Sequence, residues 1–146
     1  MNTPLNRRRW LQLAASAGAA PVLKGEARQI ANQHFAIAVD QNTGALTSLL
    51  VKRNGAELVS EKRLAANFRL CAPLPDYLCN YVDGARQQAR RVEAAGDRVD
   101  VEFSGMRAEK GEVPIDLSYT IRLDGDTVHF RARLVNRGPH PVSEFW

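Results

Sequence analysis

The 146-residue sequence has little of what a self-contained enzyme site is usually built from. Its three histidines, His34, His129 and His140, are scattered, and neither cysteine lies near one of them, so the spacing of a metal site is missing. No glycine-rich loop leads from a strand into a helix to hold a phosphate, and no G-x-S-x-G motif presents a nucleophile. We therefore expect no metal and no cofactor, and these absences disfavour an enzyme that works alone.

Long apolar runs are also missing. Residues 10–23 carry no charge, but this stretch is alanine-rich and shorter than the roughly 20 apolar residues that cross a bilayer. A cluster of three arginines, residues 7–9, comes directly before it. A basic patch followed by a short apolar stretch with small residues predicts a cleavable export signal over residues 1–27 and no stable membrane span.

The order of residues in this signal resembles the twin-arginine motif. Arg7 and Arg8 match the arginine pair, Trp10 the bulky apolar position and Leu11 the leucine. The flanking residues, Asn6 and Gln12, depart from the usual serine or threonine and lysine. The resemblance implies the twin-arginine export machinery as a partner and a periplasmic or extracellular location. An ordinary secretory signal, or a basic helix that stays attached, are the alternatives.

The basic charge of the chain lies mostly in the signal. The whole chain has 20 Lys+Arg and 16 Asp+Glu, and residues 1–27 hold four of the basic residues and one acid. Residues 28–146 therefore carry 20 − 4 = 16 basic and 16 − 1 = 15 acidic residues, a formal charge of +1. Nucleic-acid binding needs a clustered basic face, so we expect no nucleic acid as a partner. The length of residues 28–146 is enough for a single domain.

Cysteine is scarce too, with only Cys71 and Cys79. An oxidising compartment would permit a disulfide between them. Two separate small residues of the core are the alternative.

Alternation with period two is the main pattern after the signal. From Val113 to Leu123 every second residue is apolar, and a turn at residues 124–126 leads into a similar run over 128–134. Residues 35–39 and 99–103 alternate in the same way. The pattern predicts an all-β, antiparallel β-sandwich with one buried and one solvated face. The only helix candidate, residues 85–95, has no apolar stripe.

Glycines mark the expected turns. Gly44 closes a tight turn between strands at residues 35–39 and 45–51, because positive φ costs glycine nothing. Asn54-Gly55 predicts a two-residue type I′ hairpin, in which both residues have positive φ, with a return strand at 57–59. A strand at 67–71 is followed by a long loop over 72–88. A further candidate strand, 86–93, begins at the end of this loop.

The loop over residues 72–88 carries the first candidate site. Tyr77, Asn80 and Tyr81 lie there between two acids, Asp76 and Asp83. Aromatic rings stack on sugar faces while carboxylates and amides bond hydroxyls, so these residues form a candidate carbohydrate site. Solvated loop residues are the alternative.

A second candidate site follows one strand. His129 and Arg131 alternate with Val128 and Phe130, so they share a face with the polar side of the neighbouring strand, which includes Asp116. This face could bind an anionic or polyhydroxylated ligand, and a His129–Asp116 pair is the one acid–base pair that a sugar epimerase or lyase could use. An ordinary solvated face is the alternative.

Residues 32–49 resemble the opening of a known module. The positions that match its D-x-x-T-G-x-L-x-S-L turn are Asp40, Thr43, Gly44, Leu46, Ser48 and Leu49. The turn is similar to that of the β-supersandwich, galactose-mutarotase-like domain that accompanies glycoside hydrolases and polysaccharide lyases. Segments 66–70 and 80–84 also look like the N-terminal sandwich of large carbohydrate-active enzymes. The catalytic His and Glu of true mutarotases have no matching positions here.

The resemblance implies a supersandwich-like fold and a carbohydrate partner. In such enzymes the acid and base usually lie on a separate downstream barrel, which this chain does not contain. Because an apolar pattern resumes at Val142, Phe145 and Trp146, we expect an incomplete sandwich, and a final edge strand is the alternative. The leading hypothesis is a carbohydrate-binding or structural N-terminal module of an exported glycoside hydrolase. The alternatives are a stand-alone sugar epimerase or lyase and a structural protein-interaction module.

Overall fold

The computed structural model describes residues 27–61 and 67–146 and confirms an all-β, antiparallel, sandwich-like fold. The strands are β1 (Ala27–Ala31), β2 (Phe35–Asp40), β3 (Leu46–Val51), β4 (Ala56–Glu57), β5 (Arg69–Cys71), β6 (Tyr81–Asp83), β7 (Arg91–Ala95), β8 (Arg98–Ala108), β9 (Gly111–Asp124), β10 (Thr127–Asn136) and β11 (Glu144–Phe145). One short 3₁₀ helix, η4 (Gly84–Arg86), follows β6.

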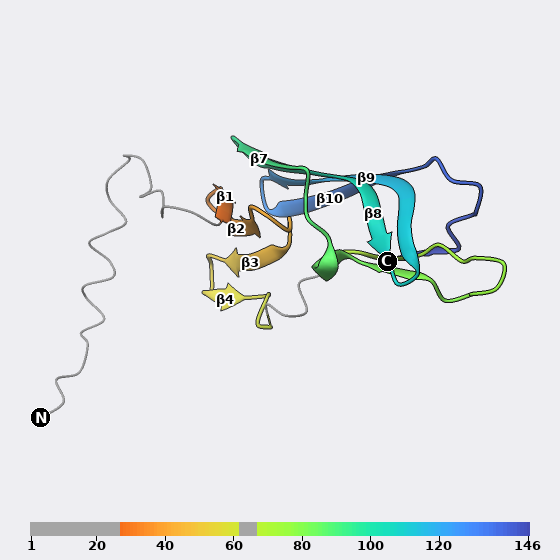
Figure 1. Cartoon of the computed structure of the whole chain (residues 1–146). Helices are drawn as coiled ribbons and strands as arrows, with labels where there is room; N and C mark the ends of the chain where they lie inside the picture. The colour runs from red at the N-terminus through yellow and green to blue at the C-terminus, as the bar shows by residue number, and fades with distance from the viewer. Residues whose placement is uncertain (1–26, 62–66) are drawn as a thin grey trace, which may run out of the picture.

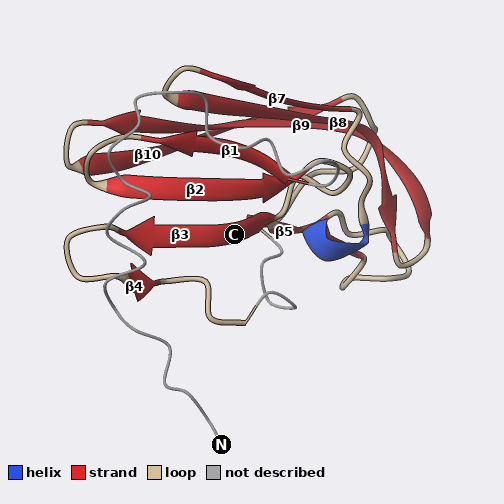
Figure 2. Ribbon diagram, turned by 90° about the vertical axis from the view of Figure 1, so that its left-hand side faces the viewer, coloured by secondary structure: helices blue, strands red, loops and turns tan. Residues whose placement is uncertain are grey.

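The strands form two sheets. The small sheet has the order β1-β2-β3-β4, and the large sheet has the order β10-β9-β8-β6-β5-β11 with β7 also paired to β8. Figure 1 shows the small sheet beside the long strands β7–β10, and Figure 2 shows the strands of both sheets running in broadly the same direction. This is the aligned packing typical of β-sandwiches.

The long hairpin β8–β9 supplies most of the core. In β9 the alternate residues from Val113 to Leu123 are all buried, as the sequence pattern predicts. In β8 the buried positions change from odd to even across Gly105, where the register with β9 shifts. Ser104 pairs with Asp116 and Met106 with Val113, so the extra residue of the bulge lies on β9, and Gly105, with φ +63°, is where the two faces of β8 exchange. Figure 1 shows β8 and β9 curving at that end.

The small sheet covers only part of the large one. Its buried side chains, Ile30, Ile37, Val39 and Leu49, join the core, and β1 lies against β7 and β8. On the opposite edge strand, β10, the apolar side chains remain partly or largely uncovered, and Phe130 is 60% exposed. The apolar face of the large sheet is therefore left open along β10.

The turn between β2 and β3 contacts the large sheet directly. The Asp40 carboxylate accepts hydrogen bonds from the Thr43 backbone amide (2.7 Å), the Thr43 hydroxyl (2.9 Å) and the Asn42 amide (2.9 Å). Burial acts to raise the pKa of Asp40, but the hydrogen bonds together lower it by more, so the pKa lies below its ordinary value. The turn presents the carbonyl of Gly44 to the Tyr119 hydroxyl, which donates to it.

Asn67 completes this contact. Its side chain donates to the Gly44 carbonyl (2.7 Å) and to the Tyr119 hydroxyl (2.5 Å), and it accepts from the Leu46 amide (2.8 Å). Asn67 has φ +52°, which asparagine tolerates better than most residues. Burial, the main cause, raises the pKa of Tyr119 far above its ordinary value, so the hydroxyl stays protonated and can donate.

Several local expectations need correction. The hairpin at Asn54-Gly55 is not a type I′ turn: Gly55 has positive φ, but Asn54 does not, and a four-residue loop, 52–55, joins β3 to β4. The loop expected over residues 72–88 contains β6 and η4, and the strand expected at 86–93 is β7, which begins at Arg91. Residues 85–95, the helix candidate rejected for its lack of an apolar stripe, contain the end of η4 and all of β7.

The last residues form an edge strand. β11 pairs with β5, so that Phe145 lies opposite Leu70. The predicted signal falls outside the described residues except for Ala27, which begins β1. In the ranges that the structure describes, no helix is long and apolar enough to cross a bilayer.

We predict that Gly44→Ala destabilises the fold by about 2–4 kcal/mol, because an added Cβ would lie 2.5 Å from Val101 Cγ1 at a residue with φ +70°. Gly55→Ala is the matched control: φ is +69°, but nothing lies within 4 Å, so a cost of about 1 kcal/mol is expected. Urea unfolding of both variants measures the difference. Equal losses would show that the close approach at Gly44 does not matter.

Candidate functional site

The hairpin that joins β5 to β6 is held by Asn80. Its side chain is 1% exposed; Nδ2 donates to the Ala72 carbonyl (2.9 Å), and Oδ1 accepts from the Lys110 amide (3.0 Å). The loop turns where Leu74 and Tyr77 exchange two backbone hydrogen bonds. The amide of Asn80, which the sequence predicts to bind a sugar, is thus buried and bonded to backbone groups.

Tyr77 lies at the outer end of this loop. Its hydroxyl donates to Glu109 Oε2 (3.1 Å), and Lys110 Nζ lies 4.6 Å from the centre of its ring. The hydrogen bond to Glu109 raises the pKa of Tyr77 above its ordinary value. The contact connects the loop to the end of β8 and fixes the position of Glu109.

Tyr81 and Asp83 line a pocket on the outer face of β5, β6 and β8. The pocket has a volume of about 450 Å³. Its lining residues are Arg69, Tyr81, Asp83, Arg86, Arg107, Ala108 and Glu109, and we call it the Tyr81 pocket. The register of β5 and β6 places Arg69 directly opposite Asp83, and the Arg69 guanidinium lies 3.9 Å from the centre of the Tyr81 ring. Two short strands thus bring an aromatic ring, a cation and a carboxylate together.

The chemistry of the Tyr81 pocket is mixed. Three guanidinium groups face two carboxylates, Asp83 and Glu109, so the lining carries a formal charge of +1. Asp83 Oδ1 accepts from the Ala85 amide (3.0 Å) at the start of η4, which orients the carboxylate. Electrostatic repulsion from the side chain of Cys79, and then burial, raise the pKa of Tyr81 above its ordinary value, so its hydroxyl is neutral at physiological pH. The pocket therefore offers both donors and acceptors beside an aromatic ring.

The structure thus brings together part of the loop site that the sequence predicts. Tyr81 and Asp83 line the pocket, Tyr77 lies next to it through Glu109, and Asp76 is exposed on the loop outside it. The arginines of the pocket were not among the predicted residues. Arg69, Arg86 and Arg107 come from three separate segments, and only strand pairing and the bulge at Gly105 place them side by side.

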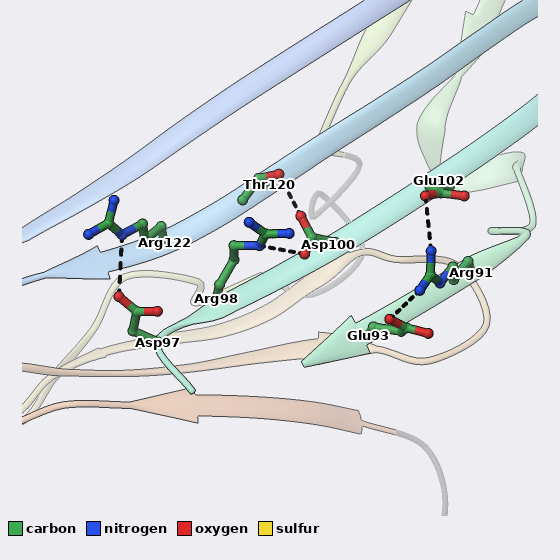
Figure 3. A network of polar contacts seen from close by, with 8 residues as sticks. All are labelled: Arg91, Glu93, Asp97, Arg98, Asp100, Glu102, Thr120 and Arg122. Atoms are coloured by element: carbon green, nitrogen blue, oxygen red, sulfur yellow. Dashed lines mark hydrogen bonds and ion pairs between the residues drawn. The ribbon is translucent and has the colours of Figure 1, made fainter. Parts of the chain in front are cut away.

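The second candidate site lies on the polar face of β7–β10. Arg91, Glu93, Arg98 and Asp100 form ion pairs along this face, as Figure 3 shows. His129 and Arg131 line a shallow depression of about 420 Å³ together with Arg122. The His129 imidazole Nε2 lies 4.0 Å from Asp124 Oδ2. Because its groups are exposed and most of its charged side chains are paired with one another, this face has the character of a solvated sheet surface.

The acid–base pair proposed for a stand-alone enzyme does not form. His129 is opposite Arg122, whereas Asp116 is opposite Val135, six residues further along β10. At about 3.3 Å per residue the two are separated by roughly 20 Å. Asp116 binds Arg137 instead (2.6 Å), and hydrogen bonds from Ser104 and then Arg137 lower its pKa.

The cysteines are free and form no disulfide. Cys71 is buried in β5, where its thiol donates to the Leu78 carbonyl (3.4 Å), while Cys79 is exposed. Among the described residues no three His, Cys, Asp or Glu side chains gather into a group that could hold a metal ion.

Comparison with known proteins gives no family for this chain. It matches no protein-family model. It also matches no curated protein at a significant level.

We predict that Asn80→Ala destabilises the protein by about 2–3 kcal/mol, because it leaves the buried Ala72 carbonyl and Lys110 amide without partners. Asn54→Ala, which removes an exposed bond to the Ala56 amide, is expected to cost less than about 1 kcal/mol. Chemical unfolding followed by circular dichroism distinguishes the two. An Asn80→Ala variant as stable as Asn54→Ala would contradict the structural role of Asn80.

Proposed function

We propose that this chain is a carbohydrate-binding β-sandwich module of an exported carbohydrate-active protein, similar to the galactose-mutarotase-like modules of glycoside hydrolases. Its ligand binds in the Tyr81 pocket, and catalysis belongs to a domain that this chain does not contain. The observation that carries the proposal is the pocket itself, in which an aromatic ring, two carboxylates and three guanidinium groups converge.

The composition of the pocket suits a sugar better than an apolar ligand. A sugar ring has hydroxyl groups around its edge and C–H groups on its faces, so it needs donors, acceptors and an aromatic surface. Asp83 and Glu109 accept, the arginines donate, and the Tyr81 ring provides the apolar contact. The hydrogen bonds that orient Asp83 and Glu109 reduce the entropy lost on binding.

The resemblance of the turn at residues 40–49 to the opening of supersandwich modules supports the same proposal. The Asp40 carboxylate, the Thr43 side chain and Gly44 each take part in the turn that the resemblance rests on. A stand-alone epimerase or lyase is disfavoured, since the one His–Asp pair available to it is separated by six residues of strand.

The first test is binding to a panel of soluble neutral and acidic polysaccharides by affinity electrophoresis of the full chain. We expect retardation by at least one of them, and we expect Tyr81→Ala to weaken that binding by about tenfold, because the aromatic contact is lost.

Leu78→Ala is the matched control. Leu78 lies on the same loop and is 75% exposed, but it does not line the pocket, so its removal should leave binding unchanged. Unfolding midpoints of the three proteins confirm that each is folded. No retardation by any polysaccharide, or equal retardation of Tyr81→Ala and the unaltered chain, would reject the proposal.

Export is tested separately. We predict that replacing Arg7 and Arg8 together by lysine stops export, because the twin-arginine route reads the arginine pair itself, whereas Arg9→Lys leaves export unchanged. Cell fractionation and immunoblotting of the full chain measure this. An ordinary secretory signal needs only positive charge, so continued export of the double lysine variant would contradict the twin-arginine assignment.

A further inference from the structure

An apolar groove lies between the two edges of the large sheet. Its volume is about 380 Å³. β10 contributes Phe130, Arg131 and Ala132, while Phe145 of β11 and the following Trp146 line the other side. The remaining lining includes Leu117 and Ile121 of β9, whose side chains are part of the core. Phe130, Phe145 and Trp146 are 60%, 44% and 58% exposed, so large apolar surfaces border the groove.

Both strands beside the groove have an unpaired edge. Over residues 27–61 and 67–146, β10 pairs only with β9 and β11 only with β5, so they are the first and last strands of the sheet order. β10 is ten residues long, and every second residue of an antiparallel edge strand directs its N–H and C=O away from the sheet. Such an edge is a template for one more strand.

The other face of β10 carries unpaired positive charge. Within the described ranges the side chains of Arg131 and Arg133 make no ion pair or hydrogen bond. The acids of the neighbouring strand, Asp116 and Asp124, already bind Arg137 and Arg122. Asp100 and Glu102, two strands away, bind Arg98 and Arg91 (Figure 3). A strand placed beside β10 would therefore meet apolar side chains on one face and two free arginines on the other.

We propose that β10 binds an extended segment of another polypeptide in which apolar residues alternate with acidic ones. The segment adds a strand to the free edge of β10, its apolar side chains enter the groove, and its carboxylates face Arg131 and Arg133. Main-chain hydrogen bonds provide affinity and the alternating side chains provide specificity, as in other cases of strand addition. The groove adjoins the Tyr81 pocket, since the Trp146 ring lies 6.3 Å from the Tyr81 ring, but the two share no lining residue, so the inference does not depend on carbohydrate binding.

A second copy of this chain is a poorer occupant. If two β10 strands paired antiparallel with their apolar faces on the same side, Arg131 of one copy would lie opposite an Arg131, Arg133 or His129 of the other. Like charges directly opposite each other on neighbouring strands are destabilising. Charge complementarity therefore favours an acidic partner.

The test uses a fluorescent ten-residue peptide of alternating valine and glutamate, and the same peptide with lysine in place of glutamate. We expect the full chain to bind the glutamate peptide at least about tenfold more tightly in fluorescence anisotropy, with an affinity that falls as salt rises. The double variant R131E/R133E should reverse this preference. Both arginines are exposed and unpaired, so the variant should fold normally, which its unfolding midpoint verifies.

Two further measurements make the outcome decisive. Two further glutamate peptides carry N-methyl groups on every second residue, one on the odd and one on the even positions. The peptide whose methyl groups replace the N–H groups that face β10 should no longer bind. Analytical ultracentrifugation of the chain alone should show a monomer. The proposal would be overturned if the glutamate and lysine peptides bound equally well, or if neither bound. It would also be overturned if both methylated peptides kept the full affinity, or if the chain formed a dimer that the peptide failed to dissociate.

Discussion

The fold depends on one buried polar contact, in which the Gly44 carbonyl meets the side chains of Tyr119 and Asn67. It joins the β2–β3 turn, the centre of β9 and the residue that leads into β5. Because the Tyr119 hydroxyl is buried, losing its partner would leave an unsatisfied group in the core. The contact therefore fixes the small sheet against the large one at a single register, and β5, from which the Tyr81 pocket is built, follows two residues after Asn67.

The sequence predicts most of the fold because alternation is a local property. The long strands β9 and β10 and the turn at Gly44 follow directly from residue order. β6 and β11 do not, since each is only two or three residues long and acquires its place from pairing with β5. The type I′ turn predicted from Asn54-Gly55 does not form, because only Gly55 of the four-residue loop has a positive φ.

The candidate site was predictable only in part, for a related reason. Tyr77, Tyr81 and Asp83 lie close together in the sequence, so their residue types could be read as a group. Arg69 and Arg107 enter the same pocket through cross-strand pairing and through the change of face in β8. Asn80 has the residue type of a ligand-binding amide, but only burial reveals that it serves the hairpin.

The bulge at Gly105 has a consequence for how this protein can change over evolution. In a strand that alternated regularly through Gly105, Arg107 would point into the core and Met106, now 2% exposed, would point to solvent. A substitution that removed the positive φ of Gly105 would thus displace a pocket arginine and a core side chain in one step. The exposed tip of the loop at residues 72–80 has no such constraint, so we expect insertions that reshape the pocket rim to be accommodated more easily there than in β8 near Gly105.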